Sequence, residues 1–214
     1  VKANRIKHLF EAVMCLTMLF GLSGCAGFDG FVRKTGPEYD VEIQSWQRII
    51  ETKGGNGMWL VSRGYRAGDN LVAISTFSHY SHIGILDHDR GKVIEPLWSG
   101  NLETPLEDFL GISHRVVLVQ PESWTPEKGS KALAKARSQL GKKYDFSGLI
   151  GLPSSNRWYC SELASWCWGR QSDRFGPWHV IHPRRHLKMG RTLFESGPRD
   201  GQPDEVPSAS TTLR

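Results

Sequence analysis

Hydrophobic side chains recur every three or four residues in three segments of the chain, which is the spacing of one face of an α-helix. The first segment spans residues 40–52. The second begins at Thr125, an N-cap followed by Pro126, and ends at Gly141. The third runs over residues 160–168. The spacing therefore predicts three helices.

Short apolar runs between turn-forming residues give a second pattern, which predicts four strands. The runs cover residues 70–75, 81–86, 92–97 and 115–120. Because the strands follow one another with helices before and after them, the predicted fold class is α+β. We expect an antiparallel sheet or half-barrel with helices packed on one side, in a domain spanning residues 40–195.

The N-terminal segment has the features of an export signal. Residues 1–24 begin with basic side chains, continue with an apolar stretch too short to span a bilayer, and end in Leu22-Ser23-Gly24. With the next residue, this sequence resembles the lipobox of bacterial lipoproteins. The resemblance implies a signal peptide over residues 1–24 and lipidation of Cys25, and Ala26 favours the periplasmic face of the outer membrane. The alternative is a chance cysteine beside a buried apolar helix.

Two further segments are expected to lie outside the folded domain. Residues 25–39 are predicted to be a glycine-containing tether between the membrane and the domain. Residues 196–214 consist largely of Gly, Pro, Ser and charged side chains with almost nothing apolar. Such a composition buries too little apolar surface to fold, so this segment is predicted to be a disordered tail.

The charge of the chain changes when the signal is removed. The 214 residues include 27 Lys and Arg and 22 Asp and Glu, which gives a net charge of +5. Three of these basic residues and one acidic residue lie in residues 1–24, which leaves 24 against 21, or +3. The remaining basic side chains are scattered, so nucleic acid is not an expected partner.

Of the four cysteines, Cys160 is the candidate nucleophile. Cys15 lies in the predicted signal and Cys25 at the lipidation site. Cys160 and Cys167 are seven residues apart on one predicted helix, about 10 Å, which is too far for a disulfide. Cys160 begins that helix, where free N–H groups favour a thiolate, whereas Cys167 lies among apolar residues. The alternative is that both thiols only fill the core.

A histidine and a glutamate flank the turn between two predicted strands. If the hairpin closes about His88 and Asp89, facing positions sum to 177, and His82 lies opposite Glu95 with Cβ atoms about 5 Å apart. A thiolate nucleophile needs an imidazole to accept and return a proton, and that imidazole needs an orienting acceptor. A bulge at Gly91 would shift the register by one residue and turn the two side chains to opposite faces.

The candidate residues lie in six short motifs, which follow in the order Gly68-Asp69, Ser81-His82-Ile83-Gly84-Ile85, Val93-Ile94-Glu95, Gly141-Lys142-Lys143-Tyr144-Asp145, Trp158-Tyr159-Cys160-Ser161-Glu162-Leu163 and Ile181-His182-Pro183. In this order they resemble the landmarks of the permuted papain-like YiiX/YaeF group of the NlpC/P60 superfamily, over about 120 residues from Gly68 to Leu187. The resemblance implies a circularly permuted cysteine-hydrolase fold. It also implies Cys160 as nucleophile, His82 as base and Glu95 as the group that orients the base.

The oxyanion of the reaction is expected near the start of the predicted cysteine helix. The backbone N–H of Cys160 is the natural donor there. The hydroxyl of Tyr144 or Tyr159 is a further candidate, and the superfamily resemblance favours Tyr144. The alternative is that both tyrosines only pack in the core. Glu162, two residues after Cys160, is expected to make a structural hydrogen bond or ion pair.

No metal or other cofactor is expected. His79 and His82 would point to opposite faces of a strand, so they do not form a pair of ligands. His179 and His182, which precede Pro183, do not have helical spacing and lack an accompanying carboxylate repeat. The histidine pattern therefore does not favour zinc.

Together these features predict a lipid-anchored cysteine hydrolase of the cell envelope, whose expected partners are a peptide, muropeptide or acyl-lipid substrate and, through lipidated Cys25, the membrane. Peptide or amide bonds are the expected targets, and the superfamily resemblance favours cell-wall peptides. One alternative is that the same residues hydrolyse or transfer fatty acyl groups. Another is a binding lipoprotein with an inactive site. We expect a monomer. Trp98, Trp158 and Trp178 either form a platform for sugar rings or lipid or belong to the core.

Overall fold

The structure is a computed structural model of the chain. It describes residues 36–65, 69, 72, 78–150, 152, 154, 156–170 and 180–199. The predicted signal peptide, Cys25 and most of the predicted tether and tail lie outside the described residues. So do Gly68, Trp178 and His179 of the sequence motifs discussed above.

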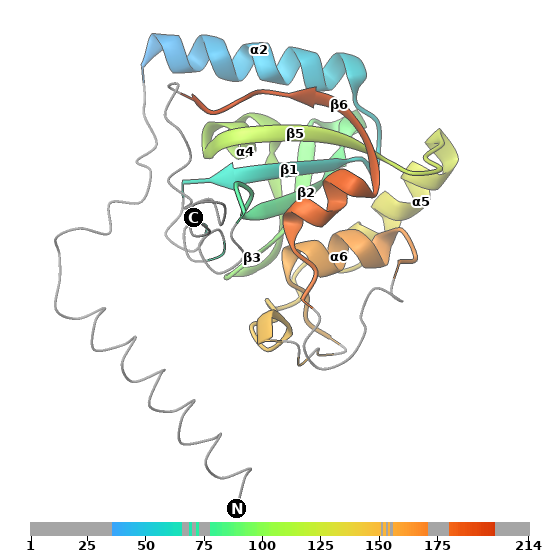
Figure 1. Ribbon diagram of the computed structural model, residues 1–214. Helices are drawn as coiled ribbons and strands as arrows, with labels where there is room; N and C mark the ends of the chain where they lie inside the picture. The colour runs from blue at the N-terminus through green and yellow to red at the C-terminus, as the bar shows by residue number, and fades with distance from the viewer. Residues whose placement is uncertain are drawn as a thin grey trace, which may run out of the picture. The chain divides into compact units, whose positions relative to one another are not determined.

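Six antiparallel strands form one sheet in the order β4-β3-β2-β1-β5-β6. Figure 1 shows β6, β5, β1 and β2 following one another below α2 (Pro37–Lys53). The α+β class and the antiparallel pairing are confirmed, and the predicted strands 81–86, 92–97 and 115–120 correspond to β2, β3 and β5. The strands are β1 (Trp59–Gly64), β2 (His82–Asp87), β3 (Lys92–Leu97), β4 (Gly100–Pro105), β5 (Ser113–Pro121) and β6 (Gly190–Glu195).

The sequence patterns did not indicate β1, β4 and β6. Strand β1 is buried at every position, so its side chains show no alternation of apolar and polar residues. The other two strands lie at the edges of the sheet and are partly exposed. Of the predicted strand 70–75 only Val72 is described, and its backbone is helical, so the prediction is wrong at that residue.

The three predicted helices are confirmed, and a short one follows β4. Thr125 caps its helix as expected, because its side chain accepts a hydrogen bond from the N–H of Lys128 at 3.3 Å. None of the helices in the described part of the chain is long and apolar enough to cross a bilayer. The described helices are α2 (Pro37–Lys53), α4 (Leu106–Gly111), α5 (Pro126–Arg137) and α6 (Cys160–Cys167).

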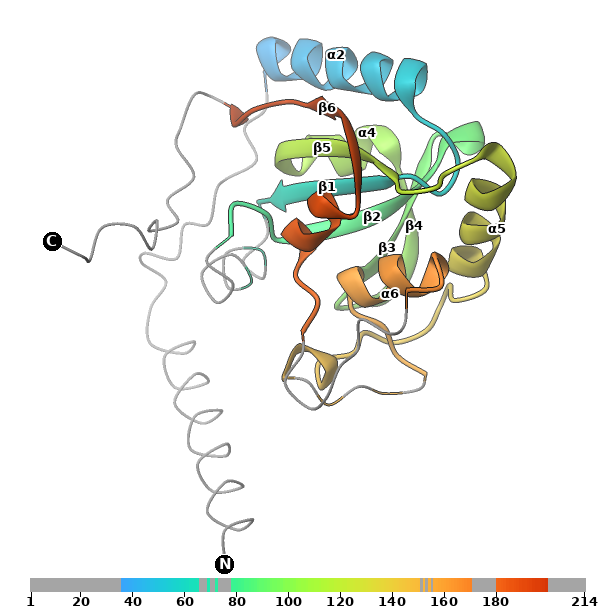
Figure 2. The ribbon, with the colours of Figure 1, turned by 45° about the vertical axis from the view of Figure 1, so that its right-hand side comes forward.

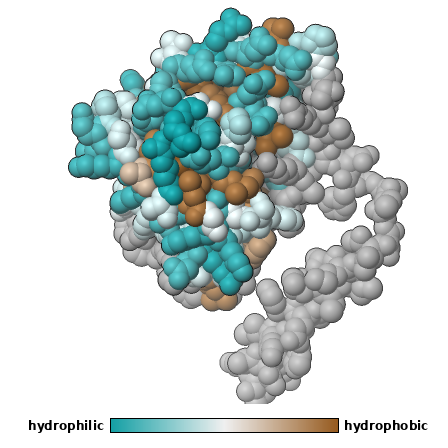
Figure 3. Space-filling model, turned by 180° about the vertical axis from the view of Figure 1, so that it is seen from behind, coloured by the Kyte–Doolittle hydropathy of each residue, from teal (hydrophilic) through white to brown (hydrophobic). Residues whose placement is uncertain are grey.

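Helices pack on both faces of the sheet rather than on one side, which differs from the expected arrangement. Side chains alternate along β1, so Trp59 and Val61 join a core cluster with α5 and α6, whereas Leu60 joins another with α2 and α4. Figure 2 shows α2 on the opposite side of the sheet from α6. From behind, the described surface is largely hydrophilic, with patches of hydrophobic residues between the polar ones (Figure 3).

The folded domain extends beyond its predicted limits at both ends. Helix α2 begins at Pro37, inside the predicted tether. Residues 196–199, the start of the predicted tail, also pack on the domain. The N–H of Ser196 donates to the carbonyl of Val116 at 3.0 Å. The guanidinium of Arg199 lies over the ring of Trp46 at 4.4 Å, so a cation–π contact holds this end of the chain against α2.

Candidate active site

Cys160 is the first residue of α6, and its side chain is 6% exposed within the core that this helix forms against the sheet. The preceding residue, Tyr159, has extended backbone and is the N-cap. Its N–H donates to Oε2 of Glu162 at 3.3 Å, which is the structural hydrogen bond expected for Glu162. The first N–H groups of a helix have no carbonyl partner within it, so the N–H of Cys160, the first residue of α6, is a candidate donor at this position.

The hairpin of β2 and β3 brings His82 and Glu95 together, although not in the predicted register. The strands join through a 3-10 turn at His88–Arg90. Ile85 pairs with Ile94, so facing positions sum to 179 rather than 177 and the predicted opposition is wrong by two residues. Since side chains alternate with a period of two, a shift by two keeps both on one face. His82 Nε2 and Glu95 Oε2 are 2.7 Å apart.

The imidazole of His82 lies between the thiol of Cys160 and the carboxylate of Glu95. Burial of the ring by itself lowers the pKa of His82. Hydrogen bonds to Cys160 and Glu95, and the negative charges of both, outweigh burial and raise this pKa from 6.5 to about 10. Because Nε2 faces Glu95, Nδ1 is the nitrogen left for the thiol. The arrangement keeps His82 protonated at neutral pH.

A threonine that the sequence patterns did not indicate holds the other oxygen of the glutamate. Thr104 Oγ1 donates to Glu95 Oε1 at 2.6 Å. Thr104 lies on β4 opposite Val93, two residue pairs along from Glu95 and therefore on the same face of the sheet. Both oxygens of this fully buried carboxylate are therefore bound, one by Thr104 and one by His82. Nothing in the sequence pointed to Thr104, because β4 itself was not predicted.

Thr104→Val is expected to lower kcat about tenfold with little change in KM, because valine has a similar volume but leaves Oε1 of the buried Glu95 without its donor. Thr104→Ser keeps the hydroxyl and is expected to retain most of the activity. The measurement is kcat and KM as a function of pH. Deprotonation of His82 sets the alkaline limb of the pH–rate profile, so a misplaced Glu95 is expected to move this limb as well. Equal activity of the two variants would contradict a positioning role.

The two candidate tyrosines have different surroundings. Tyr144 is buried, and its backbone forms a parallel bridge with Trp158. Burial, with the negative charges of Cys160 and Asp69, raises the pKa of Tyr144 well above its usual value, so its hydroxyl remains a donor. The hydroxyl of Tyr159 accepts the N–H of Ile181 at 3.0 Å. The charge of Cys160 thus acts on Tyr144, while the hydroxyl of Tyr159 binds the segment after α6.

A buried aspartate holds the segment that follows Tyr144. Asp145 Oδ1 accepts the hydroxyl of Ser147 at 2.6 Å and the N–H of Gly148 at 3.0 Å. Its Oδ2 accepts the N–H of Ser154 at 2.9 Å. A Cβ at Gly148 would lie 2.8 Å from Tyr159 Cδ1, so only glycine allows this close approach. The segment is thus held against the start of α6.

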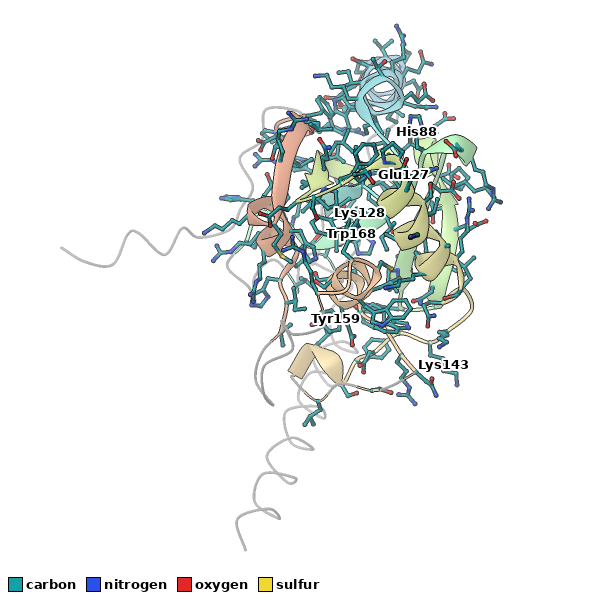
Figure 4. All side chains as sticks on the ribbon, turned by 90° about the vertical axis from the view of Figure 1, so that its right-hand side faces the viewer. His88, Glu127, Lys128, Lys143, Tyr159 and Trp168 are labelled. Carbon is teal, nitrogen blue, oxygen red and sulfur yellow. The ribbon has the colours of Figure 1, made fainter. Side chains whose placement is uncertain are left out.

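The second cysteine of α6 is buried away from this chemistry. Cys160 and Cys167 are both free, so the prediction that they form no disulfide is confirmed. Burial raises the pKa of the Cys167 thiol, although the charge of Lys135 opposes this effect. Figure 4 labels the neighbouring Trp168 and the N-cap Tyr159, which mark the two ends of α6. Cys167 is therefore expected to be a poor nucleophile.

The remaining histidines offer no metal site among the residues that the structure describes. His186 is fully buried, bound to Ser165 Oγ at 3.1 Å and packed on Trp59, and burial lowers the pKa of His186 to about 4. His82 is bound to Glu95. No group of three or more His, Cys, Asp or Glu side chains in the described ranges is placed to hold a metal ion.

Comparison with known proteins decides the family. Residues 65–186 match the family model of the permuted papain-like amidase enzymes, YaeF/YiiX, C92 family. This range is more than half of the chain and includes Cys160, His82 and Glu95. The chain belongs to this family. The resemblance noted from the six motifs is confirmed, and membership makes the chain a permuted papain-like amidase by family.

The fold is similar to that in the crystal structure of the metalloprotein YiiX from Escherichia coli O157:H7, with a TM-score of 0.53 and 21% sequence identity. The match covers 69% of this chain and 98% of the YiiX chain, and at this identity it shows the fold alone. YiiX is named a metalloprotein, whereas the described residues here do not offer three metal-binding side chains together. No match is found among the curated proteins.

Proposed function

We propose that the protein is a lipid-anchored cysteine amidase or peptidase of the cell envelope, in which Cys160 is the nucleophile, His82 the general base and acid, and Glu95 the orienting group. The observation that carries this proposal is the imidazole of His82, 2.7 Å from the buried carboxylate of Glu95 and within hydrogen-bonding reach of Cys160. A thiol, an imidazole and a carboxylate in this order are the arrangement in which a nucleophile gives its proton to a base that the third group orients.

The reaction follows from these roles. The thiolate of Cys160 attacks the carbonyl carbon, and the carbonyl electrons move to the oxygen. When this intermediate collapses, the C–N bond breaks and the leaving amine takes a proton from the imidazolium of His82. A water molecule then gives a proton to His82 and attacks the thioester, which releases the carboxylic acid and restores the thiolate. Glu95 keeps the ring oriented and stabilises its positive charge throughout.

The oxyanion would lie at the start of α6. The backbone N–H of Cys160, which belongs to the first turn of α6, would supply one donor there. The hydroxyl of Tyr144 supplies a second donor, since the raised pKa of Tyr144 keeps its proton and the charge on Cys160 acts on it. Tyr159 stays the N-cap residue whose hydroxyl binds the Ile181 N–H. We therefore assign the oxyanion hole to Cys160 N–H and Tyr144.

The proposed substrates are peptide or amide bonds, and cell-wall peptides are favoured by the superfamily resemblance. The test is to incubate wild type and Cys160→Ala with muropeptides, peptide amides and acyl-lipids and to identify products by mass spectrometry. Amine release from a peptide or muropeptide that requires Cys160 supports the proposal. Release of fatty acid alone would favour the acyl-hydrolase alternative, and no Cys160-dependent product from any substrate would favour an inactive binding lipoprotein.

The membrane anchor rests on the sequence alone, through the lipobox-like segment that ends at Cys25. Cells that express the wild-type protein are expected to incorporate radiolabelled palmitate into it, and the Cys25→Ala variant is expected to take up none. Fractionation is expected to place the wild-type protein in the outer membrane. Label that persists in Cys25→Ala, or no label in the wild type, would refute the anchor without affecting the proposed catalysis.

A further inference from the structure

Three large apolar side chains project into water close to one another. Trp98 is 61% exposed, Leu152 55% and Phe146 52%, and only Val41, on α2, exceeds them among the large hydrophobic side chains of the described residues. Single exposed apolar side chains are common on protein surfaces, whereas a cluster of them marks an interaction site. We call these three side chains the apolar tip. Trp158, in contrast, is buried in the core, so of the two described tryptophans considered as a platform only Trp98 is open to a partner.

Contacts between two segments of the chain bring the apolar tip together. The ring centroids of Trp98 and Phe146 are 6.0 Å apart at an interplanar angle of 65°. The N–H of Leu152 donates to the carbonyl of Ser147, the residue after Phe146, at 3.0 Å. Between these residues the chain forms the short 3-10 turn η2 (Gly148–Ile150), which Figure 1 shows in gold at the lower end of the described chain, below α6 and away from α2. The apolar tip therefore belongs to this end of the domain.

The backbone that carries the apolar tip is held in place without a partner. The buried carboxylate of Asp145 accepts the N–H of Gly148 at 3.0 Å and the N–H of Ser154 at 2.9 Å, so it closes the loop that bears two of the three side chains. The N–H of Asn101 donates to the carbonyl of Lys142 at 2.9 Å, which fixes the start of this loop to β4. Because the loop is already ordered, binding costs little conformational entropy of the backbone.

The charge of this end of the domain is positive. Residues 141–157 contain three basic side chains and one acidic side chain, Asp145, which is buried and hydrogen-bonded. Lys143 is exposed, and its carbonyl accepts the N–H of Trp158 at 3.3 Å, so its backbone is fixed as well. Figure 4 shows Lys143 at the same lower end of the molecule as η2. The apolar tip is thus accompanied by positive charge, which favours an anionic partner.

The size of the apolar tip favours a membrane over a second protein. If a fully exposed side chain of this size presents about 200 Å², the three together present roughly 350 Å². A stable protein interface buries about 800 Å² on each partner, so the tip is too small for one. A bilayer requires less, because the predicted lipid anchor already keeps the domain at its surface. Trp, Phe and Leu next to Lys are also the side chains that proteins place at the boundary of headgroups and acyl chains.

We propose that the apolar tip inserts into an anionic phospholipid bilayer, as a second membrane contact beside the lipidated Cys25. Its three side chains enter the boundary of the acyl chains, and the lysines beside them attract the lipid phosphates. A Cβ at Gly148 would lie 2.8 Å from the ring of Tyr159, the N-cap of α6, so this loop touches the start of the helix. Docking of the tip would therefore hold the start of α6 near the membrane. The inference rests on the proposed function for the lipid anchor alone.

The test measures contact between Trp98 and acyl chains in the full-length, lipidated protein. The protein is reconstituted into vesicles of phosphatidylethanolamine and phosphatidylglycerol with brominated acyl chains, which quench tryptophan fluorescence on contact. Trp98→Phe is expected to lose about half of the wild-type quenching or more, because the other described tryptophans are buried or half-buried. Phe146→Ser combined with Leu152→Ser leaves Trp98 in place and is expected to lose about as much. Val41→Ser, at the 64% exposed position of α2, is the matched control and is expected to leave the quenching unchanged.

The contribution of charge is tested on the same vesicles. Lys142→Glu combined with Lys143→Glu is expected to reduce the quenching of Trp98 about threefold when the vesicles contain phosphatidylglycerol. In vesicles of brominated phosphatidylcholine, which carry no net charge, the same variant is expected to be quenched like the wild type. Equal losses in both kinds of vesicle would overturn the proposal of an anionic lipid surface.

Equal quenching of wild type and Trp98→Phe would overturn the proposal, because the apolar tip would then not reach the acyl chains. A dimer in sedimentation velocity that Phe146→Ser abolishes, without quenching of Trp98, would also overturn it, because the tip would then join two copies of the chain. The anchor and the tip fail separately. A wild type that incorporates palmitate but shows no quenching of Trp98 would keep the anchor and reject the tip, and neither result depends on turnover of a substrate.

Discussion

Cys160→Ala is expected to abolish amide hydrolysis, with kcat lowered about 10⁴-fold or more, because the reaction then has no nucleophile to form the acyl-enzyme. The same change is expected to remove labelling by iodoacetamide. Cys167→Ala is the matched control on the same helix. Burial raises the pKa of the Cys167 thiol, so this cysteine is expected to contribute neither activity nor labelling. The measurements are initial rates and labelling stoichiometry by mass spectrometry on the two variants.

Two results would contradict this assignment. Equal labelling of both cysteines in the folded protein would mean that the surroundings of Cys160 do not activate it. Retention of a substantial rate in Cys160→Ala would place the nucleophile elsewhere. Thermal unfolding of each variant accompanies these measurements, because Cys160 and Cys167 both lie in the core that α6 forms. A Cys160→Ala protein that unfolds like the wild type and is inactive isolates the chemical role.

The hairpin illustrates how far the sequence determines the site. The pattern of apolar and polar residues located β2 and β3 and put His82 and Glu95 on the same face. It did not give the register, because the register depends on the number of residues in the turn. The predicted hairpin has a two-residue turn at His88 and Asp89. In the structure Asp87 pairs with Lys92, so the turn has four residues and contains the 3-10 segment His88–Arg90. The side-chain contact survived the error because the shift was even.

Other parts of the site could not be predicted because they depend on tertiary contacts. Thr104 binds Glu95 from an edge strand whose residues, including exposed Leu102, lack a strand pattern. Strand β1 is buried on both faces, so its residues do not alternate. In contrast, helix α6 was predictable, since the spacing of its apolar residues predicted a helix over residues 160–168 with Cys160 at its start. The helices could therefore be predicted from local sequence, whereas β1, β4 and the contact of Thr104 with Glu95 depend on neighbouring strands in the sheet.

Glu95→Gln is expected to lower kcat about 10²-fold while KM changes little. The hydroxyl of Thr104 donates to Oε1 of Glu95, so the oxygen of the glutamine amide is expected to face Thr104 and its NH₂ group His82. The amide then donates to Nε2, which leaves the proton of a neutral ring on Nδ1, facing Cys160. In that tautomer His82 cannot accept the proton of the thiol. The double variant with Thr104→Val is expected to recover part of the rate, because the amide is then free to turn.

The same substitution tests the electrostatic role of Glu95 through pH. The pKa of His82 is raised from 6.5 to about 10, so the stability that its protonation contributes is fully present below pH 6.5 and is lost as pH rises towards 10. Removing the carboxylate charge lowers this pKa, so the alkaline limb of the pH–rate profile is expected to move to lower pH in Glu95→Gln. The wild type is expected to have a higher free energy of unfolding than Glu95→Gln at pH 6.5, and this difference is expected to shrink as the pH rises towards 10. An alkaline limb at the same pH in both proteins would show that Glu95 does not stabilise the imidazolium, and the assignment of Glu95 as orienter would fail with it.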